Sequence, residues 1–215
     1  MKLLALPLLA FALVAAKPAP EPSALPINPP AEVMANPANK LILQLSNGGT
    51  VVIMMRPDAA PHQVERVQTL VRQGFYDGTI FHRVIPGFMA QGGDPTGTGE
   101  GGSKLPDVKA EFNSLPHLRG TVAAARAESE DSANSQFYIM FGPKASLDHN
   151  YTVFGRVISG MDAVDKIAPG EPPSNPTKIV HASLGDGSAP PAKPAQAAPP
   201  VQPAAPAPQG TTPGK

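Results

Sequence analysis

The 215-residue sequence has no cysteine, so it can contain neither a disulfide framework nor a lipidated thiol. An excess of charge of one sign is also absent, because 17 basic and 17 acidic residues leave a formal net charge of zero. Without a basic cluster, nucleic acid is not expected as a partner. The five histidines are dispersed without the close pairing of metal ligands, so no metal site is expected. The fold must therefore rely on packing.

Long apolar runs are equally scarce, and the only one lies at the start of the chain. Lys2 precedes the apolar run Leu3–Ala16, which closes in small residues. This pattern is typical of a secretory signal peptide, here residues 1–16. The run is shorter than the ~20 apolar residues that a membrane-spanning helix needs. We therefore expect an exported protein without stable membrane insertion, periplasmic in a Gram-negative cell and otherwise secreted.

Proline and alanine dominate two further stretches without apolar periodicity, residues 17–38 and residues 185–215. Such a composition cannot bury enough apolar surface to offset the entropy of ordering, and it predicts disordered or polyproline II spacers. The segment between them, residues 39–184, is long enough for one compact domain with a hydrophobic core. We expect both spacers to be dispensable for the activity of that domain.

Periodicity within this domain predicts many short strands and few helices. Alternating apolar residues on both sides of Asn47-Gly48-Gly49 predict a β-hairpin over residues 41–55. Helical spacing predicts a helix from about Ala59 to Gln73, with Asp58 as its N-cap and Gly74 as its left-handed C-terminal residue. Further elements are predicted at Ile80–Val84, Phe88–Gln91, Thr121–Ala124, Gln136–Met140, Val153–Val157 and Lys178–Ser183, with a brief helix over Met161–Ile167. This order favours an all-β barrel or sandwich capped by helices over βαβ units.

The most informative stretch is Phe81–Asp94, which combines an arginine, large apolar residues, an amide and several glycines. These residue types can make a shaped apolar site with one strong donor. Two later blocks, Asn134–Ile139 and Val153–Val157, accompany it. In order and spacing the three blocks closely resemble the cyclophilin family of peptidyl-prolyl cis-trans isomerases, and the resemblance covers about Asn39 to Leu184. It implies a mainly β fold, a closed eight-stranded antiparallel β-barrel capped by two α-helices.

The resemblance implies a reaction that breaks no covalent bond, so neither a nucleophile nor a cofactor is required. Rotation about a peptide bond faces a barrier of roughly 18–20 kcal/mol, and the proline nitrogen regains its lone pair in the twisted state. A fixed donor aimed at that nitrogen binds the transition state better than either ground state. Arg83 is the candidate catalytic residue, because its guanidinium stays charged and offers several donors in a rigid fork.

The resemblance also implies an apolar pocket for the proline ring, with polar groups around it. The residues that carry over are Phe88, Met89, Tyr138 and Leu147 for the pocket, Gln91 and Gln136 for polar contacts, Ala125 and Arg126 for backbone contacts, and Tyr151 for the rim. The expected partners are proline-containing, unfolded or partly folded polypeptides, bound by a monomer that assists the folding of exported proteins. The alternatives are a non-catalytic proline-binding or chaperone module, and an envelope protein in which the barrel is only a scaffold.

Two positions depart from the commonest pattern of the family. Ser146 stands where many cyclophilins have a tryptophan, and Tyr151 stands where animal relatives have a histidine. The first change predicts weak binding of the family's inhibitor cyclosporin, because an aromatic anchor is missing. Elsewhere, Gly97-x-Gly99-x-x-Gly102 formally matches a dinucleotide fingerprint, but no βαβ pattern surrounds it and a flexible loop is predicted. His82 is expected to face the barrel interior as a hydrogen-bonded structural residue.

Overall fold

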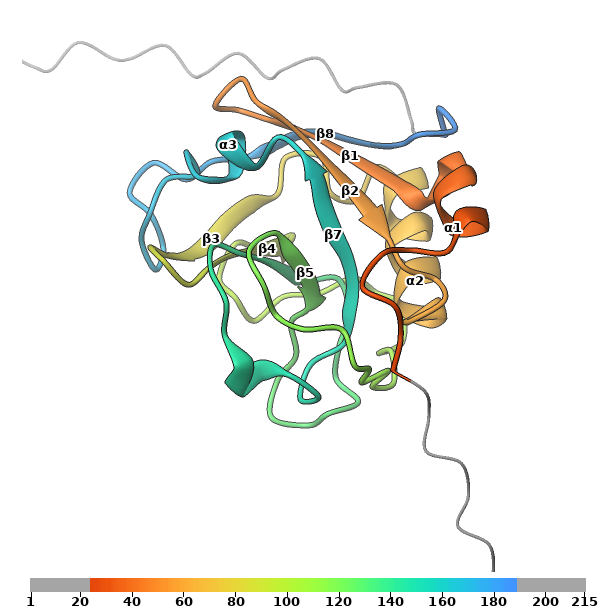
Figure 1. Ribbon diagram of the computed structural model, residues 1–215. Helices are drawn as coiled ribbons and strands as arrows, with labels where there is room; N and C mark the ends of the chain where they lie inside the picture. Colours follow the sequence, from red (N-terminus) through yellow and green to blue (C-terminus); the bar gives the residue numbers. More distant parts are fainter. Residues whose placement is uncertain (1–23, 189–215) are drawn as a thin grey trace, which may run out of the picture.

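The computed structural model describes residues 24–188, and the predictions made for residues 1–23 and 189–215, the signal peptide included, lie outside the described residues. Eight antiparallel strands form one curled sheet in the order β3-β4-β6-β5-β7-β2-β1-β8 (Figure 1). The strands are β1 (Lys40–Leu45), β2 (Thr50–Met55), β3 (Ile80–Ile85), β4 (Met89–Asp94), β5 (Thr121–Ala124), β6 (Phe137–Met140), β7 (Val153–Ser159) and β8 (Ile179–Leu184). The mainly β, eight-stranded antiparallel architecture predicted from the sequence is confirmed.

The two edges of the sheet, β3 and β8, meet along a short seam. An isolated antiparallel bridge joins Ile80 to Lys178, and the N–H of Gly78 donates to the carbonyl of Ile179 at 2.7 Å. In the strand order β3 and β8 are the two ends of the sheet. The barrel is thus a curled sheet that closes at one place, which is looser than the closed barrel expected from the sequence.

Helix α2 (Pro61–Arg72) buries one apolar face against the barrel, but it begins differently from the prediction. Asp58 is not its N-cap, because the carboxylate of that residue forms an ion pair elsewhere. The carboxylate of Glu111 accepts N–H bonds from His62 and Gln63 at 3.0 and 2.9 Å instead. A carboxylate from a distant loop therefore satisfies the first free donors of the helix, where negative charge is also favoured.

Gly74 follows α2 in the left-handed conformation predicted for it, with φ of +66°. The other helices are short. They are α1 (Ala31–Ala35), α3 (Met161–Val164) and the 3₁₀ turns η1 (Pro37–Asn39) and η2 (Ala145–Leu147). The brief helix predicted to reach Ile167 is a single turn, although Ile167 is buried as its spacing implies. Within residues 24–188, no helix combines the length and apolar character needed to span a membrane.

Two apolar clusters fill the protein, because strand side chains alternate between two faces of the sheet. The larger cluster occupies the barrel interior and includes Phe81 and Phe137, whose rings meet edge to face. The smaller cluster lies on the outer face and includes Met89 and Tyr138. Tyr138 and Met140 belong to the outer cluster, whereas Ile139 between them belongs to the interior cluster. The outer cluster is the platform on which the candidate site is built.

Residues 24–30, which we call the N-terminal strap, run along the outside of the barrel beside β7 (Figure 1). The N–H of Leu25 donates to Oγ of Ser114 at 2.8 Å, and the side chain of Leu25 packs against the outer cluster. Helix α1 and the turn η1 follow the strap. The spacer predicted for residues 17–38 is therefore wrong for residues 24–38, which are ordered on the surface of the domain.

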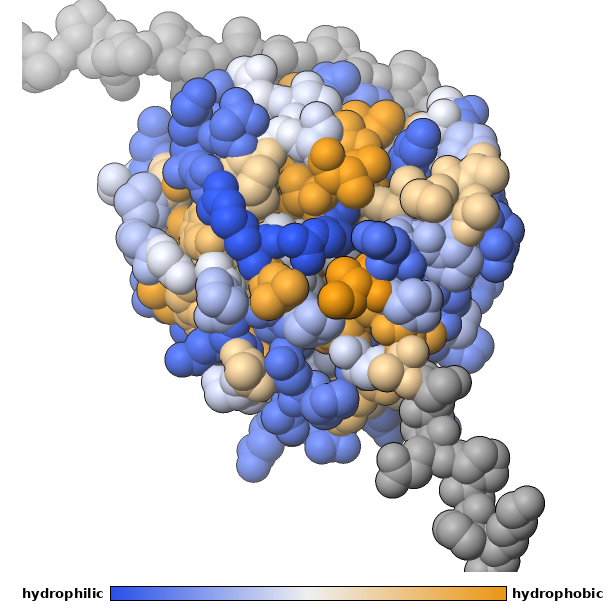
Figure 2. Space-filling view, viewed as in Figure 1, coloured by the Kyte–Doolittle hydropathy of each residue, from blue (hydrophilic) through white to orange (hydrophobic). Residues whose placement is uncertain are grey.

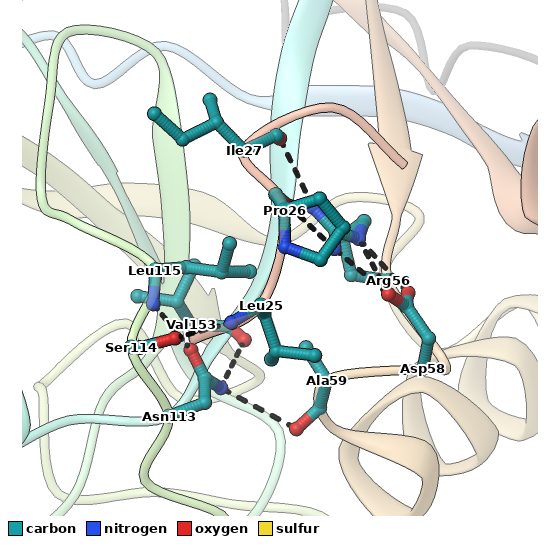
Figure 3. A network of polar contacts seen from close by, with 10 residues as sticks. All are labelled: Leu25, Pro26, Ile27, Arg56, Asp58, Ala59, Asn113, Ser114, Leu115 and Val153. Carbon is teal, nitrogen blue, oxygen red and sulfur yellow. Dashed lines mark hydrogen bonds and ion pairs between the residues drawn. The ribbon is translucent and has the colours of Figure 1, made fainter. Parts of the chain in front are cut away.

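A buried arginine fastens the strap. Arg56 is only 3% exposed, and its guanidinium donates to the carbonyls of Pro26 and Ile27 at 3.0 and 3.1 Å (Figure 3). The same group forms a 2.7 Å ion pair with Asp58. Hydrogen bonds to the main-chain carbonyls of the strap keep it ordered. Its low apolar content therefore wrongly predicted disorder.

The strap borders an apolar groove of about 380 Å³ on the face of β7. Ile27, Leu118 and Ile158 line this groove and remain exposed to solvent. Figure 2 shows apolar side chains gathered near the middle of this face, with hydrophilic side chains between them. The groove lies on a different set of residues from the candidate site described next.

Candidate active site

The candidate site is built on the hairpin formed by β3 and β4. Arg83 pairs with Gln91 across the two strands. A register shift between Phe81 and Arg83 reverses the usual alternation, so Phe81 is buried in the barrel while Arg83, two residues later, reaches the outer face. A β-bulge that re-aims a side chain in this way is common next to active sites. His82 is the extra residue of the bulge.

A cavity of about 130 Å³ opens on the outer face beside Arg83 and Gln91. It is lined by Arg83, Phe88, Met89, Gln91, Ala125, Arg126, Tyr138, Leu147 and Tyr151. The structure therefore brings together every site residue predicted from the sequence except Gln136. The volume equals that of about four water molecules at ~30 Å³ each, which suits one small ring.

Gln136 lies beside the cavity and fixes Gln91 through a chain of hydrogen bonds. Nε2 of Gln91 donates to Oε1 of Gln136 at 2.9 Å. Nε2 of Gln136 in turn donates to the carbonyls of Gly99 and Gly101, each at 2.8 Å. These bonds assign the orientation of both amides and give Gln91 a fixed position at the cavity.

Asp94 organises the glycine-rich loop, residues 95–102, that supplies those carbonyls. Its buried carboxylate accepts N–H bonds from Thr96 at 2.8 Å, Gly99 at 2.6 Å and Gly101 at 3.1 Å. Burial by itself would raise the pKa of Asp94, but these hydrogen bonds outweigh it and lower the pKa to about 2. The glycine motif thus lies in a loop, as predicted, and a carboxylate holds that loop in shape.

Tyr138 lines the cavity, and a histidine holds its hydroxyl from behind. Nε2 of His117 lies 3.0 Å from the hydroxyl of Tyr138, and Nδ1 lies 2.9 Å from the carboxylate of Asp148. Because a carboxylate only accepts hydrogen bonds, this geometry assigns the ring proton to Nδ1 and makes Nε2 the acceptor for Tyr138. Burial lowers the pKa of His117 although Asp148 opposes the shift, so the ring is neutral at neutral pH. No sequence pattern predicted this role for His117, because 31 residues separate it from Asp148.

Comparison with known proteins decides the family. Residues 40–184 match the family model described as cyclophilin type peptidyl-prolyl cis-trans isomerase/CLD. The chain belongs to the cyclophilin family. A probable peptidyl-prolyl cis-trans isomerase of Brucella suis is 48% identical over 166 residues, which cover 70% of this chain and 84% of the relative.

Solved structures agree with this assignment. The cyclophilin AquaCyp293 of Hirschia baltica is 30% identical with a TM-score of 0.65, covering 69% of this chain and 74% of that one. A cyclophilin-type isomerase of Cryptosporidium parvum, crystallised in the presence of the dipeptide Ala-Pro, is 26% identical with a TM-score of 0.63, covering 67% of this chain and 98% of that one. As a member of the family, the chain is a peptidyl-prolyl cis-trans isomerase. The family match begins at Lys40, so the strap lies outside it.

In this cyclophilin, one part of the cavity rim is formed by Arg126 stacked on Tyr151. The guanidinium carbon lies 4.8 Å from the centre of the Tyr151 ring, and the group donates to the carbonyl of Asn150 at 3.1 Å. The N–H of Ala125 donates to the carbonyl of Gln136 at 3.0 Å. Of the backbone groups of Ala125, its carbonyl is therefore the one left for a bound peptide.

Two other residues of this cyclophilin, Ser146 and His82, were singled out in the sequence, and the structure shows where each of them lies. Ser146 is exposed in η2 and does not line the cavity, although the adjacent Leu147 does. His82 is buried, but neither ring nitrogen has a hydrogen-bond partner among residues 24–188, so the hydrogen bonds predicted for it are wrong. Burial lowers the pKa of His82, Asp94 opposes this shift and Arg83 adds to it, so the ring behind Arg83 is neutral at neutral pH.

Proposed function

We propose that this cyclophilin isomerises Xaa-Pro bonds in exported polypeptides and that Arg83 is its catalytic donor. The observation that carries the proposal is the meeting of Arg83, Gln91 and an apolar wall at one ring-sized cavity. The apolar wall seats the proline ring, while the two polar side chains lie next to each other on β3 and β4 to meet the peptide. We propose that it acts as a monomer, since every residue predicted for the site lies in the cavity or beside it.

Arg83 acts on the twisted state of the peptide bond. Its donors stabilise the lone pair that appears on the proline nitrogen only when conjugation with the carbonyl is lost. One donor aimed at developing charge contributes roughly 3–4 kcal/mol, whereas an acceleration of about 100,000-fold requires roughly 7 kcal/mol. The remainder comes from orientation of the ring and from removal of water by the buried side chains Met89 and Tyr138, because the twisted amide is less polar than the planar one.

The proposed substrates are polypeptides rather than free amino acids. A cavity of about 560 Å³ shares Gln91, Ala125 and Arg126 with the proline cavity, so a chain bound at its proline can continue into this space. The Cryptosporidium parvum relative was crystallised with Ala-Pro, and we extend that ligand class to this protein. The balanced charge of the chain supports protein rather than nucleic acid as the partner.

The export part of the proposal is supported by the first residues of the sequence. Lys2 followed by a short apolar run with small closing residues is the pattern of a secretory leader. Uncatalysed proline isomerisation takes about 10–100 s at 25 °C, which is slow enough to limit the folding of newly exported chains. An isomerase in the same compartment would relieve that limit.

A protease-coupled isomerisation assay on short Xaa-Pro peptides tests the catalytic part. Replacing Arg83 with alanine should lower kcat/KM by about 100-fold or more, the usual effect of losing one donor at developing charge. Arg83→Lys should recover little, because an ammonium lacks the planar fork. Thermal unfolding of both variants must match the wild type. Near wild-type activity in folded Arg83→Ala would instead support a non-catalytic proline-binding module.

Cell fractionation tests the export part separately. The full chain should appear outside the cytoplasm, and a chain that lacks residues 1–16 should remain inside. Cytoplasmic retention of the full chain would contradict export without affecting the catalytic proposal.

A further inference from the structure

Beside the active site, the segment that precedes β8 runs antiparallel to β3, along the edge of β3 that does not pair with β4. Val84 and Gly170 exchange both of their backbone hydrogen bonds, at 2.8 and 3.0 Å, and form an isolated antiparallel bridge. In an antiparallel pair, the residue before one partner lies opposite the residue after the other. The backbone therefore sets Arg83 and Glu171 directly across from each other.

The side chains of these two residues meet in a specific way. Nε of Arg83 donates to Oε2 of Glu171 at 2.7 Å. Within residues 24–188, no group accepts a hydrogen bond from the two terminal nitrogens of Arg83, although Arg83 lines the proline cavity. A carboxylate that took both terminal nitrogens would occupy the donors needed for substrate. One that takes Nε leaves the remaining donors free.

We propose that Glu171 is a positioning residue for catalysis, which holds the guanidinium of Arg83 by its Nε–H and leaves the terminal donors to the substrate. The inference rests on the proposed role of Arg83. The side chains of Arg83 and Glu171 are 42% and 51% exposed, and an ion pair with this exposure adds little to stability. Its value is geometric, because it restricts a long side chain that has many accessible rotamers when free.

The loop that carries Glu171 is suited to this task. Gly170 has φ of +140°, and a Cβ at this position would lie 2.7 Å from Cα of Pro173, so only glycine fits. Pro172 and Pro173 follow Glu171 and restrict the backbone on that side. A constrained backbone on one side and the bridge to Val84 on the other fix where the carboxylate sits.

Exchange NMR on a proline peptide tests the proposal, because it measures turnover at the bound peptide separately from binding. Glu171→Ala should lower kcat by about tenfold with KM changed by less than threefold, as expected when a catalytic group loses its support. Glu171→Gln should lose less, since an amide oxygen still accepts from Nε. The matched control is Glu65→Gln, which removes the same charge from the exposed face of α2 and should leave kcat unchanged.

A double-mutant cycle shows whether Glu171 affects kcat through Arg83. In the Arg83→Ala background, Glu171→Ala should have no further effect on kcat, because the group that it positions is gone. Unchanged or increased kcat in Glu171→Ala alone, or the same fractional loss with and without Arg83, would overturn the inference. Failure of the proposed function is distinguishable, since Arg83→Ala alone would then keep its activity.

Discussion

Replacing Arg56 with alanine should release the N-terminal strap and lower the free energy of unfolding by about 3 kcal/mol. The substitution removes two charge-assisted hydrogen bonds to the carbonyls of Pro26 and Ile27 and leaves Asp58 without its cation. Breaking a buried ion pair costs about 3–5 kcal/mol. The lower end applies because the released strap exposes the unpaired groups to water. For a protein of this size, each kcal/mol shifts Tm by about 2–4 °C, so a loss of about 6–12 °C is expected.

Thermal and urea unfolding followed by circular dichroism measures this loss. Arg156→Ala is the matched control, because Arg156 is an exposed arginine on the same face, and its replacement should change stability by less than about 0.5 kcal/mol. Isomerase activity measured well below Tm should be unchanged in Arg56→Ala, since Arg56 does not line the proline cavity.

Removing residues 24–30 from both backgrounds shows whether the arginine acts through the strap. Deletion should destabilise the wild type and have little further effect on Arg56→Ala, because both changes break the same contacts. The reasoning is refuted if Arg56→Ala unfolds within 2 °C of the wild type, or if the two losses simply add.

Three further predictions concern the site and its supports. Burial lowers the folded-state pKa of His82 and of His117 below the ordinary 6.5, so the unfolded chain binds more protons than the folded protein below that pH. The free energy of unfolding should therefore fall on acidification, and a flat stability profile from pH 7 to 5 would contradict this. Asp94→Asn should lower the free energy of unfolding by about 2 kcal/mol above pH 4, as follows from the shift of the pKa of Asp94 from 3.8 to about 2. The difference from the wild type should shrink as the pH falls toward 2, and a difference that persists at pH 2 would point to another cause. Ser146→Trp should tighten cyclosporin binding by at least about 30-fold in a titration, because it restores an aromatic anchor, and unchanged affinity would show that the anchor is not what the wild type lacks.

Elements that depend on neighbours in the sequence were predictable from pattern alone. The hairpin of β1 and β2 follows from alternation around Asn47-Gly48-Gly49, and α2 follows from helical spacing that ends at Gly74. Pattern did not give the number of strands, because short apolar runs do not reveal which partner they pair with. The resemblance to cyclophilins supplied that number and the residues that line the cavity.

Contacts between residues far apart in the sequence account for what was missed. Asp58 has the right residue type for an N-cap, but the carboxylate of Glu111, 49 residues after His62, accepts the first N–H bonds of α2 instead. The strap is ordered by hydrogen bonds that its composition does not reveal. Arg83 was recognised as a donor, but its partner Glu171 lies 88 residues later in the chain. No local spacing rule predicts such a partner.

The pairing of the first strand with the last affects how the protein reaches this structure. Leu41 in β1 lies opposite Leu184 in β8, so the sheet joins the two ends of the family region. Contacts between such distant residues require closure of a very long loop, and folding rates fall as the mean sequence separation of contacts rises. During synthesis, β1 can pair with β2, but its other edge has no partner until β8 is complete. This isomerase therefore passes through a stage in which it is itself an unfinished chain with an open strand edge.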